Sequence, residues 1–215
     1  MFDHAFTQVV SSLRRSFESA LLQRQAVEER FQVDVFLGDL SFETSYGLPG
    51  EQRPARIRVD VSLDWPTWSQ TALRSWTIGE EPDELPEVLA EVAFRVQGLA
   101  SRPDVDAIGA VVPPALPLLA EDVLERSGPT IEERHGEPDG EAGDGGGSDG
   151  NGEHDGIEYA IEVDYEGSST LDERFLADPD AIDLALAPLG RLVASILVRL
   201  ADLPLDFRPP RPADD

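Results

Sequence analysis

The sequence predicts an α+β fold, in which an antiparallel sheet of about four to five strands is covered by helices. Residues 57–65 and 157–165 alternate apolar and polar side chains, as strands with one buried face do. Segments near both ends of the chain repeat apolar residues every three to four positions, which is typical of amphipathic helices. Because each strand has one apolar face, we expect the helices to form one layer on one side of the sheet.

Residues 4–30 are predicted to form one long N-terminal helix, with Asp3 available to cap its first turn. Its apolar stripe comes close to a coiled-coil heptad pattern, which Arg24 interrupts. The stripe therefore predicts either packing on the chain's own sheet or a seam for a partner helix, including a homodimer. It consists of Phe6, Val9, Val10, Leu13, Phe17, Ala20, Leu21 and Val27.

Strands are expected after this helix. The apolar alternation between residues 31 and 46 changes phase at Gly38-Asp39, which predicts a bulge or a tight bend there. Residues 57–65 form the clearest strand of this half, and Pro66-Thr67 predicts a turn after it. Residues 68–78 are then expected to return as an antiparallel strand.

The middle of the chain is ambiguous in its pattern. Residues 85–99 fit a helix, with Pro86 in the first turn and Gly98 near the end, but they also alternate as a strand would. We favour the helix and keep the strand as the alternative. A proline-rich segment then leads to a short helix expected near residues 117–126, which Gly128-Pro129 would end.

Residues 132–156 differ in kind from the rest of the chain. They contain nine glycines, nine acidic residues and no large apolar side chain, so burial cannot offset the entropy of ordering them. We expect a disordered acidic linker inserted in a single α+β domain made of residues 1–131 and 157–203. The strand at 157–165 would then join the earlier strands across the linker.

The last predicted element is a largely apolar C-terminal helix. Asp178-Pro179 caps the helical region, and Pro188 is expected to kink or restart it. Residues 189–203 are apolar nearly all round, which is typical of a helix in the centre of a protein. The tail from 204 to 215 is rich in proline and is expected to be extended.

Charge dominates the composition. The 215 residues include 43 acidic and 17 basic residues, for a net charge of −26, and every basic residue is arginine. Self-repulsion of this size destabilises a compact chain in dilute buffer, whereas at 1 M salt the Debye length falls to about 3 Å. The composition resembles that of a conserved haloarchaeal acidic protein family. The resemblance implies a salt-adapted cytoplasm, and the alternative is an acidic surface that binds a basic partner.

Membrane insertion and secretion are not expected. The apolar stretch near residues 192–200 is interrupted by Arg191, Ser195 and Arg199, and a span needs roughly 20 largely apolar residues. The first residues lack a basic segment followed by an apolar block, so no cleaved signal is expected. We therefore expect a cytoplasmic protein.

Missing side chains exclude most catalytic chemistry. The chain has no cysteine and no lysine, which excludes thiol nucleophiles, cysteine-ligated metals, Schiff bases and phosphate-loop lysines. Of the three histidines, His135 and His154 fall in the predicted linker and His4 begins the first helix, so none is held rigidly for acid–base work. The linker matches a calcium loop poorly, because His154 and Ala160 replace the glycine and the bidentate glutamate. No cofactor and no metal site is expected.

One region departs from the acidic background. All three tryptophans fall between residues 65 and 76, and between residues 52 and 78 four arginines outnumber two acids. Folded as a hairpin, this segment would carry a serine, threonine and arginine face flanked by indoles, which could stack a planar ligand and bind an anion. The alternative is ordinary core packing and ion pairing. The candidate binding residues are Arg56, Arg58, Arg74, Trp68 and Trp76.

Three functions are compatible with these observations. The favoured one is a non-catalytic accessory protein that binds another protein through the N-terminal helix or the Trp/Arg hairpin. The first alternative is a module that binds nucleic acid or a nucleotide through that hairpin by base stacking. The second alternative is a hydrolase that uses only carboxylates, since acidic residues are abundant.

Overall fold

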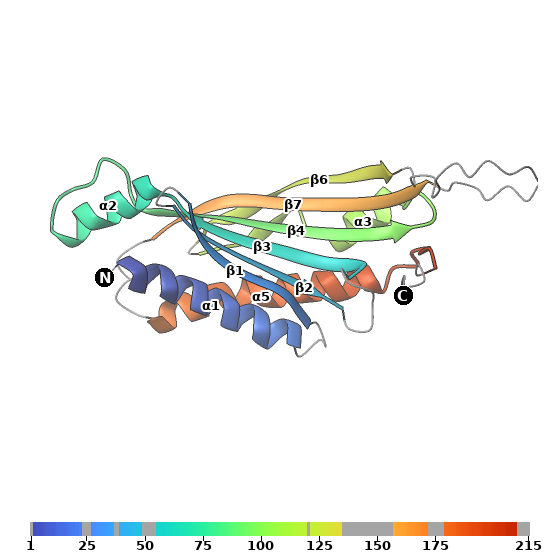
Figure 1. The fold of residues 1–215 in the computed structure, drawn as a ribbon, viewed down its shortest axis with the longest axis horizontal. Helices are drawn as coiled ribbons and strands as arrows, with labels where there is room; N and C mark the ends of the chain where they lie inside the picture. The colour runs from blue at the N-terminus through green and yellow to red at the C-terminus, as the bar shows by residue number, and fades with distance from the viewer. Residues whose placement is uncertain are drawn as a thin grey trace, which may run out of the picture.

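The structure is a computed structural model that describes residues 2–22, 27–36, 39–48, 55–119, 121–134, 157–171 and 179–209. Within these residues the fold is α+β, with a seven-stranded antiparallel sheet in the order β1-β2-β3-β4-β7-β6-β5 (Figure 1). The strands are β1 (Val27–Phe36), β2 (Asp39–Gly47), β3 (Ile57–Trp65), β4 (Glu87–Leu99), β5 (Ala115–Pro117), β6 (Val123–Arg134) and β7 (Glu158–Thr170). The helices are α1 (Phe2–Leu22), α2 (Thr67–Thr77), α3 (Val105–Val111) and α5 (Pro179–Ala201).

The helix layer covers one face of the sheet. Helices α1 and α5 lie side by side under the strands, and α2 projects past one end of the sheet (Figure 1). Strand β7 pairs with β4 over most of its length, with Phe94 opposite Val163. The predicted covering of one sheet face and the joining of the strand at 157–165 to earlier strands are thus confirmed.

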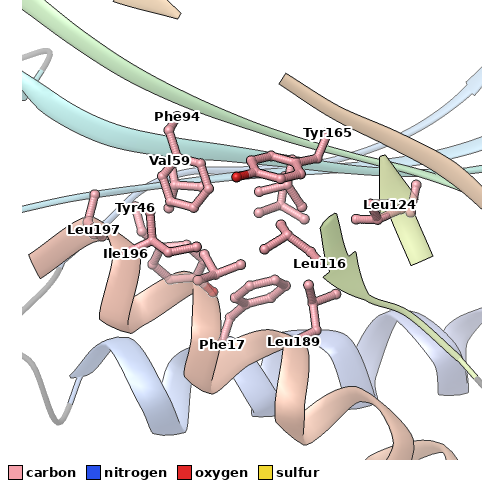
Figure 2. Close-up of a cluster of buried hydrophobic side chains, with 14 of the residues drawn as sticks. Phe17, Tyr46, Val59, Phe94, Leu116, Leu124, Tyr165, Leu189, Ile196 and Leu197 are labelled. Atoms are coloured by element: carbon pink, nitrogen blue, oxygen red, sulfur yellow. The ribbon is translucent and has the colours of Figure 1, made fainter. Parts of the chain in front are cut away.

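The core lies between the sheet and the two long helices. Figure 2 shows Phe17 of α1 and Leu189 of α5 pointing toward Tyr46, Phe94 and Tyr165 of the sheet. All five side chains are almost completely buried. The Tyr165 hydroxyl donates to the carbonyl of Pro113 at 2.7 Å, and burial raises the pKa of Tyr165 to about 12.

Helices α1 and α5 approach each other closely at Gly190. A Cβ atom built on Gly190 would lie 2.8 Å from the backbone carbonyl oxygen of Ser16, so only glycine fits there. One turn earlier on α5, the carbonyl of Leu186 accepts a hydrogen bond from the Ser16 hydroxyl at 2.8 Å. The small residues therefore set the distance between the two helices.

Helix α5 combines an apolar sequence with a central position. By length and composition, Asp183–Ala201 would suffice to cross a membrane, a property that it shares with core helices. Its residues Leu189, Val193 and Leu197 are buried in the core of this fold. The predicted C-terminal helix is confirmed, and it runs through Pro188 without a break.

The N-terminal helix is shorter than predicted. It ends at Leu22, and residues from Val27 belong to β1, which forms a hairpin with β2 beyond the predicted bend at Gly38-Asp39. Residues 27–30 were predicted to be helical, but they pair with β2 as the start of β1. Pairing between strands contributes more free energy than the local helical spacing of apolar residues, so the strand forms. Val10, Phe17 and Leu21 of the stripe are buried within the chain itself, as the intramolecular alternative predicts.

Two segments adopt the opposite secondary structure to the one favoured. Residues 67–77 form helix α2 and not a returning strand, so the predicted Trp/Arg hairpin is wrong. Ser69, Gln70, Ala72 and Leu73 are buried at helical spacing, against the end of the sheet. Residues 87–99 form strand β4, so the favoured helix at 85–99 is wrong and the strand alternative is right.

The region after residue 100 also differs from expectation. In place of a helix near 117–126, the chain forms the β5–β6 hairpin, and β6 continues to Arg134. The short helix of this region, α3, lies earlier, at Val105–Val111. The additional strands β5 and β6 explain why the sheet has seven strands and not four to five. The expected linker thus loses residues 132–134 to β6, and its remainder lies outside the described residues.

The first residues of the tail contact the end of β4. Phe207 forms a bridge to Leu99, and the Arg208 amide donates to the carbonyl of Gly98 at 2.8 Å. Gly98 has a positive φ of 74°, which glycine adopts without strain. The tail up to residue 209 therefore closes the end of the sheet beside β4.

Candidate functional site: the open face of the sheet

The sheet face opposite the helices is polar, and no described helix covers it. We name it the open face. Its central side chains come from five neighbouring strands, and most are partly exposed because only their own neighbours shield them. They are Ser45, Arg58, Asp60, Ser62, Glu91, Ala93, Arg95, Glu132, Arg134, Ala160, Glu162, Asp164 and Glu166.

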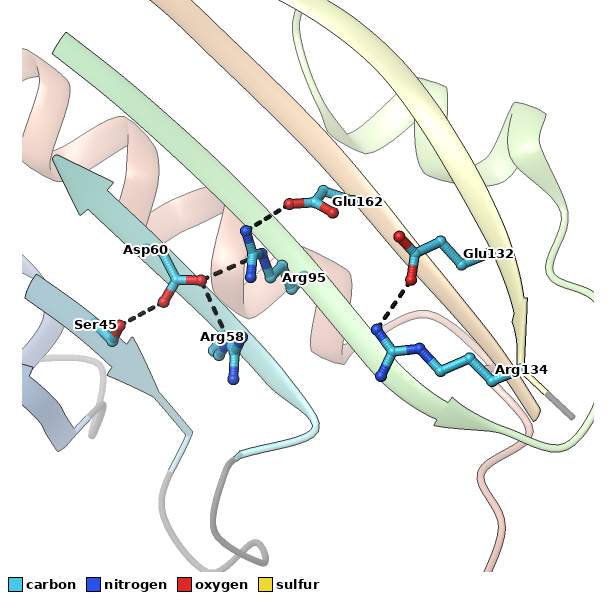
Figure 3. A network of polar contacts seen from close by, with 7 residues as sticks. All are labelled: Ser45, Arg58, Asp60, Arg95, Glu132, Arg134 and Glu162. Carbon is cyan, nitrogen blue, oxygen red and sulfur yellow. Dashed lines mark hydrogen bonds and ion pairs between the residues drawn. The ribbon is translucent and has the colours of Figure 1, made fainter. Parts of the chain in front are cut away.

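Two arginines lie directly opposite each other on this face. The register pairs Arg58 of β3 with Arg95 of β4, an arrangement of like charges that destabilises a sheet unless an acid offsets it. Asp60 supplies that acid, because its Oδ2 lies 3.3 Å from the Nε atoms of both arginines (Figure 3). The Ser45 hydroxyl donates to the other carboxylate oxygen of Asp60.

The network extends toward β7 and β6. Arg95 places its Nη2 2.7 Å from Oε1 of Glu162, so its guanidinium bridges carboxylates on β3 and β7 (Figure 3). Farther along, Arg134 pairs with Glu132 at 2.9 Å. The side chains of Arg58, Asp60 and Glu162 are only 19–27% exposed, so this part of the network is partly shielded from water. It forms an ordered polar surface across three strands.

A hollow of about 390 Å³ lies beside the network. Ala93 lines it, and this alanine is only 3% exposed although it lies on the uncovered face, because longer neighbours surround it. Ser62 and Glu91 also line the hollow, next to Asp60 and Arg95. Its walls thus combine hydroxyl, carboxylate and guanidinium groups around a small apolar floor.

Acids accumulate on the far side of Ala93. Partial burial at the rim of the hollow raises the pKa of Glu91, and the nearby carboxylates of Asp164 and Glu166 raise it further. Burial likewise raises the pKa of Asp164, followed by repulsion from Glu162. Arg95 opposes both shifts without cancelling them. The open face therefore has a neutralised half around Asp60 and an acidic half around Glu91.

Replacing the central acid tests the network. We expect Asp60→Asn to lower the free energy of unfolding by about 1 kcal/mol, because Arg58 and Arg95 then face each other without a carboxylate between them. The side chains are partly exposed, so the loss should shrink as salt rises. Urea unfolding of the parent protein and the variant, each in a lower and a higher concentration of KCl, measures the loss and its salt dependence. Equal stability of both proteins at the lower concentration would contradict the assigned role of Asp60.

The same type of substitution in the acidic half should have the opposite sign. Because the folded-state pKa of Glu91 is raised, its ionised form destabilises the fold, and this contribution diminishes as pH falls through the raised pKa toward the unfolded value. We therefore expect Glu91→Gln to raise the thermal unfolding midpoint at pH 7. The parent protein should gain stability on mild acidification as Glu91 takes up a proton, and the variant should show less of this gain because it lacks that carboxylate. Calorimetry between about pH 4 and 7 measures both, and a lowered midpoint at pH 7 would contradict the prediction.

The predicted binding residues do not form one surface. Arg58 lies on the open face in the network with Asp60, whereas Arg56 donates to the carbonyl of Arg208 at 2.5 Å and lies over the Phe207 ring. Arg74 and Trp68 belong to α2, beyond the opposite end of β3. Trp76 is also in α2, and its side chain lies outside the described residues. The stacking surface inferred from a hairpin is therefore not assembled.

Several open-face residues were not predicted from the sequence. Ala93 and Arg95 were assigned to a helix at 85–99, and Glu162 was expected only on a polar strand face. The two-residue spacing of Val88, Ala90, Val92, Phe94 and Val96, which also supported the strand alternative, was the signal for β4. The sequence does not indicate which residues lie opposite each other on neighbouring strands, because this depends on the register of strand pairing.

The chemical repertoire of this site is limited. No cluster of three metal-ligating side chains occurs among the described residues. Glu91 is exposed at the rim of the hollow, whereas a general acid with a raised pKa works best in a site that excludes water. The arrangement is suited to recognition by charge and hydrogen bonding. Comparisons with protein-family models, with curated proteins and with solved structures find no match to this chain.

Proposed function

We propose that this chain is a non-catalytic accessory protein of a salt-adapted cytoplasm, and that it binds a partner protein on the open face of its sheet. One observation carries the proposal: helices cover one face of the sheet, while the other face presents an ordered polar network beside a hollow. A sheet needs burial of one face for stability, so the second face is free for a partner.

The polar network of the open face suits a protein partner. Arg58, Asp60 and Arg95 are held in place by one another, so they offer a preorganised surface with little entropy to lose on binding. The hollow around Ala93 would receive one side chain of the partner. The acidic half near Glu91 would favour basic groups around it.

The alternatives have less support. Nucleic-acid binding by stacking required indoles beside the arginines, and Trp68 on α2 lies past the end of β3 that is opposite to Arg58. Hydrolysis by carboxylates required a buried acid pair facing a pocket, and Glu91 is exposed. Binding of a partner protein requires neither indoles beside the arginines nor a buried pair of acids.

Filling the hollow tests the proposal. Ala93→Trp would occupy the hollow, whereas Ala110→Trp places the same side chain at an exposed position of α3, in the helix layer. Each tagged variant and the parent protein are cross-linked in a lysate in molar KCl, and the captured proteins are quantified and then purified for binding measurements. The proposal predicts a partner whose affinity falls at least about tenfold with Ala93→Trp and is unchanged with Ala110→Trp.

The opposite outcome is also defined. If both tryptophan variants bind every captured partner as the parent does, the open face is not the binding surface. Circular dichroism shows whether each variant is folded, so that weaker binding caused by the changed surface is distinguished from weaker binding caused by unfolding.

The salt adaptation has its own test. With a net charge of −26, self-repulsion is long-ranged in dilute buffer, where the Debye length is about 10 Å at 0.1 M salt, and short-ranged at about 3 Å in 1 M salt. We expect the thermal unfolding midpoint to rise steeply with KCl and the protein to lose its fold in dilute buffer. Equal stability in both conditions would mean that the acidic surface does not reflect salt adaptation.

A further inference from the structure

A second surface lies on α2, away from the open face. Trp68, Thr71, Ala72 and Ser75 follow one stripe of the helix and line a hollow of about 320 Å³. The segment that follows the helix forms the opposite wall with Pro82, Asp83 and Glu84. We name this hollow the α2 groove. Helix α2, which supplies one wall of the groove, projects past the end of the sheet (Figure 1).

Hydrogen bonds hold both ends of the segment that forms the groove. Gly79, with a φ of 81°, ends the helix, and the amide of Glu80 donates to the carbonyl of Ser75 at 2.9 Å. At the other end, the Ser69 hydroxyl donates to the carbonyl of Glu87 at 2.5 Å and accepts from its amide at 2.7 Å. The returning segment is therefore fixed relative to the helix.

Trp68 is exposed to solvent, whereas the nearby Trp65 is buried. The Trp68 side chain is 43% exposed, whereas Trp65 is completely buried and donates its indole N–H to Ser69 at 2.8 Å. Ile78 and Leu85, on either side of the returning segment, are also exposed. Of these exposed apolar side chains, Trp68 lines the hollow, and tryptophan is a frequent anchor at interaction surfaces.

The segment beside the indole is rich in carboxylates. The returning segment carries Glu80, Glu81, Asp83 and Glu84. Within the described part of the chain, none of these four carboxylates takes part in an ion pair or a side-chain hydrogen bond. An indole face next to free carboxylates matches a cation that can stack and donate hydrogen bonds at once.

We propose that the α2 groove binds an arginine side chain of a partner protein, with the guanidinium stacked on Trp68 and donating to Asp83 or Glu84. A guanidinium is planar, weakly hydrated and able to donate two parallel hydrogen bonds, whereas an ammonium group is compact and strongly hydrated. In molar salt the long-range attraction is screened, so stacking and short hydrogen bonds must supply the affinity. Both requirements favour arginine over lysine. The proposal is independent of the open face.

Calorimetric titration in molar KCl tests the proposal. The probe is an acetylated and amidated peptide with two arginines separated by glycine, and the matched peptides carry lysine or uncharged citrulline in their place. The arginine peptide should bind saturably, and the lysine and citrulline peptides at least about tenfold more weakly. Trp68→Ala should weaken arginine-peptide binding at least about tenfold, as should Asp83→Asn combined with Glu84→Gln. Leu184→Ala, on the exposed side of α5, is the matched control and should change nothing.

Other outcomes would overturn the proposal. Equal binding of the lysine peptide, or full binding by Trp68→Ala, would show that the indole does not select a guanidinium. Tighter binding of a single-stranded oligonucleotide that competes with the peptide would assign the groove to nucleic acid. Absence of saturable binding by the arginine peptide would also reject it, since circular dichroism verifies that each variant is folded.

Discussion

Replacing Gly190 by alanine should destabilise the protein by about 2 kcal/mol, although alanine is the better helix former. The added methyl group would lie 2.8 Å from the backbone carbonyl oxygen of Ser16, so α1 and α5 must separate or shift. Separation also threatens the hydrogen bond from the Ser16 hydroxyl to Leu186. Overpacking against backbone cannot be relieved by a side-chain rotation, which is why we expect a large loss. Urea unfolding in molar KCl measures it.

A second glycine provides the matched control. Gly109 lies in helix α3, and a Cβ atom built there meets nothing within 4 Å. Gly109→Ala should therefore stabilise the protein by about 0.5–1 kcal/mol, because alanine loses less backbone entropy in a helix. The two substitutions differ only in what surrounds the new methyl group. Equal effects of both would contradict the close approach of α1 and α5.

Replacing Trp65 by alanine should lower the free energy of unfolding by about 3–5 kcal/mol, the second large effect we expect. The side chain is completely buried at the end of β3, and its indole N–H donates to Ser69. Ser69 in turn holds the backbone of Glu87, so this contact joins β3, α2 and the start of β4. Removal would leave a cavity and an incomplete polar contact at that junction. Chemical unfolding of the variant measures the loss.

Trp68 is the control for this substitution. It lies three residues farther on, is 43% exposed, and faces the α2 groove. Trp68→Ala should change the free energy of unfolding by about 1 kcal/mol or less. If both alanine variants were equally destabilised, Trp68 would be a packing residue, and its role in the groove would need another explanation.

The two surfaces make different demands on a partner. The open face offers arginines whose charge is already balanced by Asp60 and Glu162. The α2 groove offers an indole and two carboxylates that form no ion pair within the described residues. Ala93→Trp and Trp68→Ala therefore separate them, since each alters one surface and leaves the other unchanged.

The candidate sites were only partly visible in the sequence. Arg58 and Trp68 were selected because they stand in a stretch with excess arginine and all the tryptophans. Their placement on one surface was wrong, because it assumed that residues 68–78 return as a strand. The contacts of Arg58 with Asp60, and of Asp60 with Arg95, depend on the pairing of β3 with β4, and no spacing along the chain encodes that register.

By itself, the sequence determined the α+β class, the strands at Ile57–Trp65 and in the first half of β7, and the apolar helix that became α5. Those segments have one periodicity each, and burial of their apolar face admits one structure. Tertiary structure alone decided α2, β4 and the β5–β6 hairpin, whose patterns fit both helix and strand or neither. In these segments, pairing with a neighbouring strand or packing at the end of the sheet contributes more free energy than local propensity. The tertiary contacts therefore determine whether the segment is a helix or a strand.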